Sequence, residues 1–181
     1  MNRGLIRVSA VALAVVTLNA CSDDTTSPVD IETALLDIVP PGGATDVDPN
    51  APVVVRFDHP VGYMMAEYAE VREGDVDGPL ADGGWALSTD RTTLTFTPTQ
   101  PLKPLTTYVV HLGGGMVDEH GEHLNFERHG FDHGGEWCTE EQMGTGPMGH
   151  MGPMGQQHQH GADWRHPNGT YGMFFTFTTG V

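Results

Sequence analysis

Seven short segments of β-strand character are the feature that most constrains the fold of this chain. They occupy residues 35–39, 53–57, 68–72, 85–88, 92–97, 108–112 and 172–179, with Gly, Pro, Asp and Asn between them. Residues 92–97 alternate, so Leu94 and Phe96 share one face and the threonines share the other. No long helix is predicted, although residues 64–70 could form one or two turns. We therefore predict an all-β fold, a single antiparallel β-sandwich of about seven strands.

Composition agrees with a loop-rich β domain and limits the partners. The chain contains 24 glycines and 13 prolines, and its formal net charge is −16. Such a charge makes nucleic acid and anionic lipid surfaces poor partners and cations better ones. The acidity could equally serve only to keep the protein soluble.

The N-terminus predicts export and anchoring. Residues 1–20 combine two arginines with an apolar run at 8–18, which is too short to span a bilayer and is typical of a signal peptide. The ending Leu-Asn-Ala-Cys resembles the lipobox of bacterial lipoproteins, which implies that Cys21 is lipidated, for example with palmitate. Plain secretion with an incidental cysteine is the alternative. Ser22, in place of an aspartate, favours the outer membrane, and residues 21–33 are polar, as in a flexible tether.

Four stretches carry a resemblance to a known family. PPGGATDVDPNAPVVVRFDHPV, TTLTFTPTQPLKPLTTYVVHL, MVDEHGEHL and FFTFTTG resemble the bacterial Ig-like domains of the SbsA type, found in S-layer and surface proteins. The resemblance implies an Ig-like sandwich over residues 34–124, completed by 171–181, and an architectural or adhesive role without catalytic residues. Tyr108 resembles the tyrosine that locks a corner in such sandwiches. Leu105 stands where a turn glycine is commoner, so this bend is expected to differ.

The main departure from the family is a long His-, Met- and Gly-rich insertion, residues 125–170, before the last strand. Connections between neighbouring strands are usually far shorter. Aromatic residues within it, including Phe126 and Trp164, suggest that parts fold back on the scaffold; they could equally form a partner-binding surface.

Soft and borderline metal ligands gather in and beside this insertion. Imidazole suits Cu²⁺, Zn²⁺ or Ni²⁺, and thioethers select Cu(I). The candidate ligands are His120, His123, His129, His133, Cys138, Met148, His150, Met151, Met154, His158, His160 and His166. Cys138 could also be a free thiol or half of an intermolecular disulfide. The whole tract could equally be low-complexity sequence that binds nothing.

Enzymatic activity is not expected. Beyond residue 21 the only serines are Ser22, Ser27 and Ser88, none in a Gly-x-Ser-x-Gly elbow, and there is no His-Glu-x-x-His motif. The sequence thus predicts a lipoprotein of the cell envelope that binds or buffers metal, with copper first and zinc or nickel after it. The alternative is a structural or adhesive module that contacts an envelope protein or a glycan.

Overall fold

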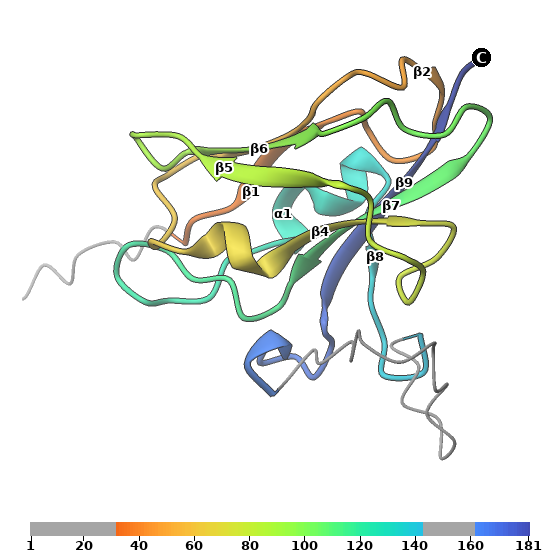
Figure 1. The fold of residues 1–181 in the computed structure, drawn as a ribbon. Coiled ribbons are helices and arrows are strands. Elements are labelled where there is room, and N and C mark those ends of the chain that lie inside the picture. The colour runs from red at the N-terminus through yellow and green to blue at the C-terminus, as the bar shows by residue number, and fades with distance from the viewer. Residues whose placement is uncertain (1–31, 143–161) are drawn as a thin grey trace, which may run out of the picture. The chain divides into compact units, whose positions relative to one another are not determined.

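Two β-sheets pack face to face around a hydrophobic core (Figure 1). The computed structural model describes residues 32–142 and 162–181, which belong to one compact unit, Ile31–Val181. Cys21 and the central part of the insertion therefore lie outside the described residues. The strands are β1 (Leu35–Val39), β2 (Ala44–Val47), β3 (Val53–Phe57), β4 (Ala69–Glu73), β5 (Gly83–Leu87), β6 (Thr93–Pro98), β7 (Thr107–Gly113), β8 (Glu136–Trp137) and β9 (Gly172–Thr179). The short helices are η1 (Met65–Tyr68), α1 (Glu127–Gly130), η2 (Phe131–His133) and η3 (Ala162–Trp164).

The first sheet contains β1, β3, β6 and β5 in that order, all antiparallel. Its register places Val55 between Ile38 on one side and Leu94 on the other, and all three side chains are fully buried. Because apolar residues alternate with more exposed ones along β3 and β6, the sheet has one apolar face. Helix η1 lies beside β5 and covers this edge of the sheet.

The second sheet is organised around β9. Strand β7 pairs with it antiparallel along nearly its whole length. The other edge of β9 is shared, because β8 pairs antiparallel with Met173–Phe174 and β2 pairs in parallel further along. Between them, the Gly43 N–H donates to the Thr176 carbonyl at 2.7 Å. Strand β4 forms the far side of the sheet, next to β7.

The prediction of an all-β sandwich is confirmed, and all seven predicted strands are present within two residues of their expected bounds. The described residues contain two further strands that the sequence does not predict. Strand β2 occupies a stretch in which the sequence predicts no strand, and its parallel pairing departs from a purely antiparallel sandwich. Strand β8 comes from the insertion.

The outer face of the second sheet is also covered. Val109 and His111 alternate with core residues along β7 and are both buried on the side away from the core. Val109 belongs to a small apolar cluster with Val76 and Cys138, while the Trp164 ring lies 5.3 Å from that of His111. The expectation that parts of the insertion fold back on the scaffold is confirmed, because Trp164 is only 8% exposed.

The connection between β6 and β7 is locked by a tyrosine corner, as predicted. The Lys103 N–H donates to the Tyr108 hydroxyl at 2.9 Å. Within this bend Leu105 has φ 51°, so a leucine occupies the left-handed conformation that favours glycine. Its side chain is 70% exposed and gains little from packing.

Replacing Leu105 with glycine should stabilise the domain relative to replacing it with alanine. Glycine relieves a left-handed strain of about 1–2 kcal/mol and loses about 0.4–1 kcal/mol through the more flexible unfolded chain. Urea unfolding of Leu105→Gly and Leu105→Ala should therefore differ by roughly 0.5–1 kcal/mol in favour of glycine. Both variants remove the same exposed side chain, so an alanine variant of equal or higher stability would contradict the strain.

Candidate functional site

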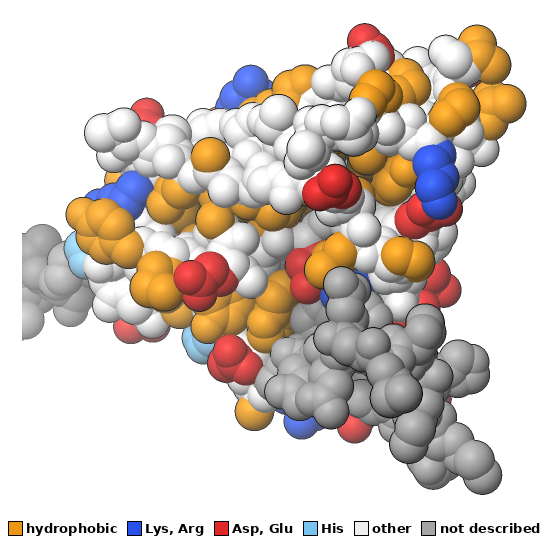
Figure 2. Space-filling model, viewed as in Figure 1, with side chains coloured by type: hydrophobic (Ala, Val, Ile, Leu, Met, Phe, Trp, Pro, Cys, Tyr) orange, Lys and Arg blue, Asp and Glu red, His pale blue; other side chains and the backbone are white. Residues whose placement is uncertain are grey.

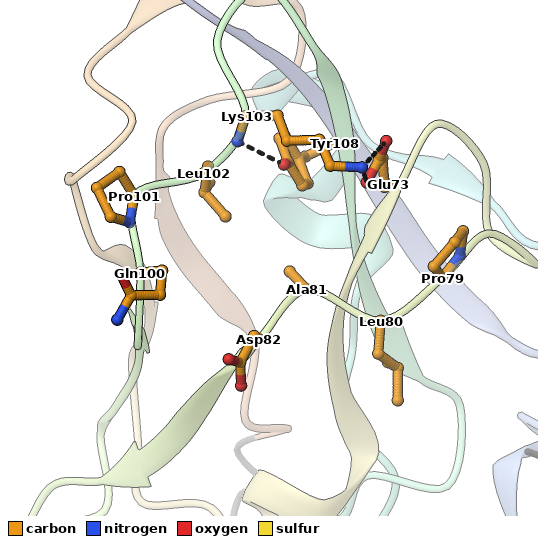
Figure 3. A pocket seen from close by; sticks show the side chains of 10 residues that line it. All are labelled: Glu73, Pro79, Leu80, Ala81, Asp82, Gln100, Pro101, Leu102, Lys103 and Tyr108. Carbon is orange, nitrogen blue, oxygen red and sulfur yellow. Dashed lines mark hydrogen bonds and ion pairs between the residues drawn. The ribbon is translucent and has the colours of Figure 1, made fainter.

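A pocket of about 380 Å³ lies at one end of the sandwich, between two connections that cross from one sheet to the other (Figure 3). One wall is the β4–β5 connection and the other is the β6–β7 connection. The floor includes Leu102 and Tyr108, which are almost fully buried. The lining residues are Glu73, Pro79, Leu80, Ala81, Asp82, Gln100, Pro101, Leu102, Lys103 and Tyr108.

The charged groups of the pocket are mostly engaged with one another. The Lys103 ammonium contacts both oxygens of the Glu73 carboxylate, at 2.9 and 2.7 Å. Hydrogen bonding to Glu73, and then its negative charge, raises the pKa of Lys103. The ten lining residues include no His, Cys or Ser, so this pocket offers walls for binding but no nucleophile paired with a base.

Two predicted ligands, His120 and His123, lie at or next to the Asp118-to-Gly121 turn. Their side chains do not converge on a common centre. The Asp118 carboxylate accepts hydrogen bonds from the backbone N–H groups of His120 and Glu122, at 2.8 and 3.0 Å. This carboxylate therefore stabilises the turn. The His123 ring donates from Nδ1 to the Gly114 carbonyl at 3.2 Å, while the His120 side chain is exposed.

Two further predicted ligands lie on the α1–η2 segment. His133 donates from Nε2 to the Leu36 carbonyl at 3.0 Å, which ties the insertion to β1. His129 lies 3.9 Å from the carboxylate of Asp132, one helical turn away. Both histidine rings thus lie next to a group of the protein, the Leu36 carbonyl for His133 and the Asp132 carboxylate for His129.

His166 sits among aromatic rings. Its ring centroid lies 5.3 Å from Trp137 and 5.8 Å from His123. Its Nδ1 accepts a hydrogen bond from the Asn168 N–H at 3.3 Å, so this lone pair is occupied. The structure therefore brings His123 and His166 together, within an aromatic cluster that packs the two flanks of the insertion against each other.

Cys138 is fully buried beside Val76 and Val109. Burial, with a smaller contribution from the negative charge of Asp75, raises the pKa of its thiol from 9.0 to about 12. A metal ligand or nucleophile must be a thiolate. At neutral pH Cys138 is a small apolar core residue carrying a neutral thiol.

No group of three or more His, Cys, Asp or Glu side chains within residues 32–142 and 162–181 could hold a metal ion. The described part of the chain therefore does not support a metal role. The remaining predicted ligands, Met148, His150, Met151, Met154, His158 and His160, lie outside the described residues.

Several buried or clustered polar residues are not among the predicted site residues. Arg72 is 1% exposed and bonds Glu70 at 2.7 Å and the Gly78 carbonyl at 2.8 Å. His111 is fully buried and donates from Nε2 to the Tyr171 carbonyl at 2.9 Å. Alternation along β4 and β7 places both on the outer sheet face. The β4–β5 connection lies against Arg72, through Gly78 and Leu80, and the insertion residue Trp164 lies against His111. No helix in the described ranges is long and apolar enough to cross a bilayer.

Comparison with known proteins assigns the chain to a family of bacterial domains. The family model of the bacterial Ig-like domain matches residues 24–131. A search of curated proteins finds no match.

Solved structures give weaker similarity. The S-layer protein rSbsC(31-844) is 17% identical with a TM-score of 0.38, over 54% of this chain and 13% of that one. Native alpha-2-macroglobulin from Escherichia coli (domains MG0-NIE-MG1) is 19% identical with a TM-score of 0.39, over 54% and 30%. An L,D-transpeptidase from Mycobacterium smegmatis is 21% identical with a TM-score of 0.36, over 47% and 37%. The chain thus spans well under two thirds of each of these proteins.

The buried thiol should make stability fall at alkaline pH. Between the thiol pKa of 9.0 and its folded value of about 12, the unfolded chain binds fewer protons than the folded one. The free energy of unfolding should therefore decrease by up to about 1.4 kcal/mol per pH unit in this window. Denaturant unfolding of the native chain and of Cys138→Ala, compared from roughly pH 8 to pH 11, isolates this slope. Equal slopes in the two proteins would show that Cys138 ionises normally in the fold.

Proposed function

Because the chain belongs to the bacterial Ig-like domain family, we propose that it is a non-catalytic structural or adhesive module of the bacterial cell envelope. The observation that carries this proposal is that several polar side chains form hydrogen bonds within the fold. Asp118 stabilises a turn, His133 ties the insertion to β1, and His111 supports the outer layer. These three side chains, which could have bound a ligand, hold the fold together instead.

The proposed anchoring rests on the N-terminal sequence. Residues 1–20 would be a cleaved signal peptide, Cys21 would carry the lipid, and residues 21–33 would link the lipid to the sandwich. Residues 34–124 and 171–181 would be the Ig-like domain, interrupted by the insertion 125–170. Ser22 after the cysteine favours the outer membrane. The partner would be an envelope protein or glycan, since a net charge of −16 disfavours nucleic acid.

Changing Cys21 to serine should release the protein from the membrane. Lipid chains contribute about 0.8 kcal/mol per buried CH₂ group, and the serine hydroxyl cannot carry the same thioether-linked lipid. Fractionation of cells expressing the native chain or Cys21→Ser should place the first with membranes and the second in the soluble fraction. Cys138→Ser is the matched control and should remain with membranes. Soluble native protein would contradict the anchor.

Metal binding through the insertion is the competing function, and titration separates the two. The comparison protein carries alanine at Met148, Met151, Met154, His158 and His160. Under our proposal, calorimetry with Cu(I) and Cu(II) gives the same weak heats for the native chain and this variant. Tight binding by the native chain alone would show that the Met- and His-rich tract has a metal role.

A further inference from the structure

The connection between β3 and η1 presents two large apolar side chains to solvent. Tyr63 is 76% exposed and Met64 is 64% exposed, although their neighbours Val61 and Met65 are buried in the core. Figure 2 shows hydrophobic side chains on the surface at this end of the molecule and also at the opposite end, where Leu105 and Val181 are exposed. Because the residues on both sides of Tyr63 and Met64 are buried, this exposed part of the loop has a defined position.

Hydrogen bonds from two other loops fix this tip. The Val61 N–H donates to the Arg91 carbonyl at 2.9 Å, and the Gly62 N–H donates to the Val117 carbonyl at 2.9 Å. The Val117 N–H in turn donates to the sulfur of Met65 at 3.1 Å. The exposure of Tyr63 and Met64 is therefore built into the fold and is not a consequence of fraying.

The Tyr63 ring is positioned by a cation. The Arg91 guanidinium lies 4.6 Å from the ring centroid and also donates to the Val61 carbonyl at 3.0 Å. Glu119 accepts from the same guanidinium at 2.7 Å, so its charge is balanced locally. Tyr63 and Met64 thus form an electroneutral, preorganised apolar tip on a strongly acidic protein; we call these two residues the loop tip.

The chain enters the domain at this same end of the sandwich. The Ala34 N–H donates to Asp58, which directly follows β3, at 2.7 Å. The Asn125 N–H donates to the Thr33 carbonyl at 2.9 Å. The ten residues between Cys21 and Glu32 allow these two residues to lie at most about 40 Å apart when the chain is fully extended. A lipid on Cys21 would therefore keep the loop tip within reach of the bilayer.

We propose that the loop tip docks into the headgroup region of the bilayer that holds the Cys21 lipid. This inference rests on the proposed lipidation. Tyrosine suits the interface because its ring is apolar and its hydroxyl is polar. Methionine is apolar and adapts to irregular surroundings. The docked orientation would turn the opposite end of the sandwich, which carries the pocket, away from the membrane.

The bilayer that fits is zwitterionic. Glu67 and Glu122 are exposed on the two segments that flank the loop tip, η1 and the turn after Asp118, and would be repelled by anionic headgroups. Two side chains are also too few to recruit the free domain. A tether supplies an effective concentration of about millimolar, so docking is expected only for the anchored protein.

The test uses the chain from Cys21 to Val181, coupled through Cys21 to a maleimide lipid in phosphatidylcholine vesicles. Burial protects Cys138 from the maleimide. An environment-sensitive fluorescent amino acid replaces Met64 in one protein and Leu105 in another. Leu105 is the matched control because it is 70% exposed and lies at the opposite end of the sandwich, near Gly180 (Figure 1). Brominated phosphatidylcholine quenches only probes that reach the bilayer.

The expected result is a loss of fluorescence at position 64 without a loss at position 105. Tyr63→Ser should weaken quenching at position 64 while leaving thermal unfolding unchanged, and added phosphatidylglycerol should weaken it further. Absence of quenching at position 64, equal quenching at both positions, or stronger quenching with phosphatidylglycerol would overturn the docking. Because the lipid is attached chemically, failure here would leave cellular lipidation untouched, and failure of the Cys21→Ser fractionation would leave this measurement valid.

Discussion

The pairing of β9 on both of its edges is the constraint on which the rest of the domain depends. This last strand carries Met173, Phe175 and Phe177 into the core and joins β7 on one side to β2 and β8 on the other. Its partner β7 ends at Gly113, so the pairing must close a loop of nearly sixty residues. The packed flanks of the insertion reduce the entropy cost of closing this loop, because they shorten the segment that remains to be closed.

The main strands could be predicted because their own residues carry the signal. Val53, Val55 and Phe57 alternate toward the core, and so do Leu94 and Phe96, whatever their neighbours do. Strands β2 and β8 could not be predicted in this way. They are short edge strands with exposed polar residues, and their only reason to be extended is hydrogen bonding to β9, far away in the sequence.

The contacts of the candidate ligands could not be predicted either, because several of them also depend on residues that are distant in the sequence. Adjacent histidines and carboxylates in the sequence indicate a shared metal, yet the partners that the fold supplies are backbone groups. Asp118 accepts from turn amides, and His133 finds the carbonyl of Leu36, almost a hundred residues earlier. The contact between Tyr63 and Arg91 is likewise invisible from spacing, because it depends on two loops meeting at one end of the sandwich.

The two flanks of the insertion are joined by hydrogen bonds between Cys138 and residues 171–172, and this affects how the sequence can evolve. Cys138 donates to the Gly172 carbonyl and accepts from the Tyr171 N–H, each at 2.8 Å, so the chain leaves and re-enters the sheet at adjoining points. Each doubling of a loop closed in this way costs only about 0.6 kcal/mol. Peptides of very different length and composition can therefore be exchanged between residues 142 and 162, provided that the packed residues on either side, Trp164 and His166 among them, are kept. The site is a natural graft point, where sequence can drift or acquire new roles without passing through an unfolded ancestor.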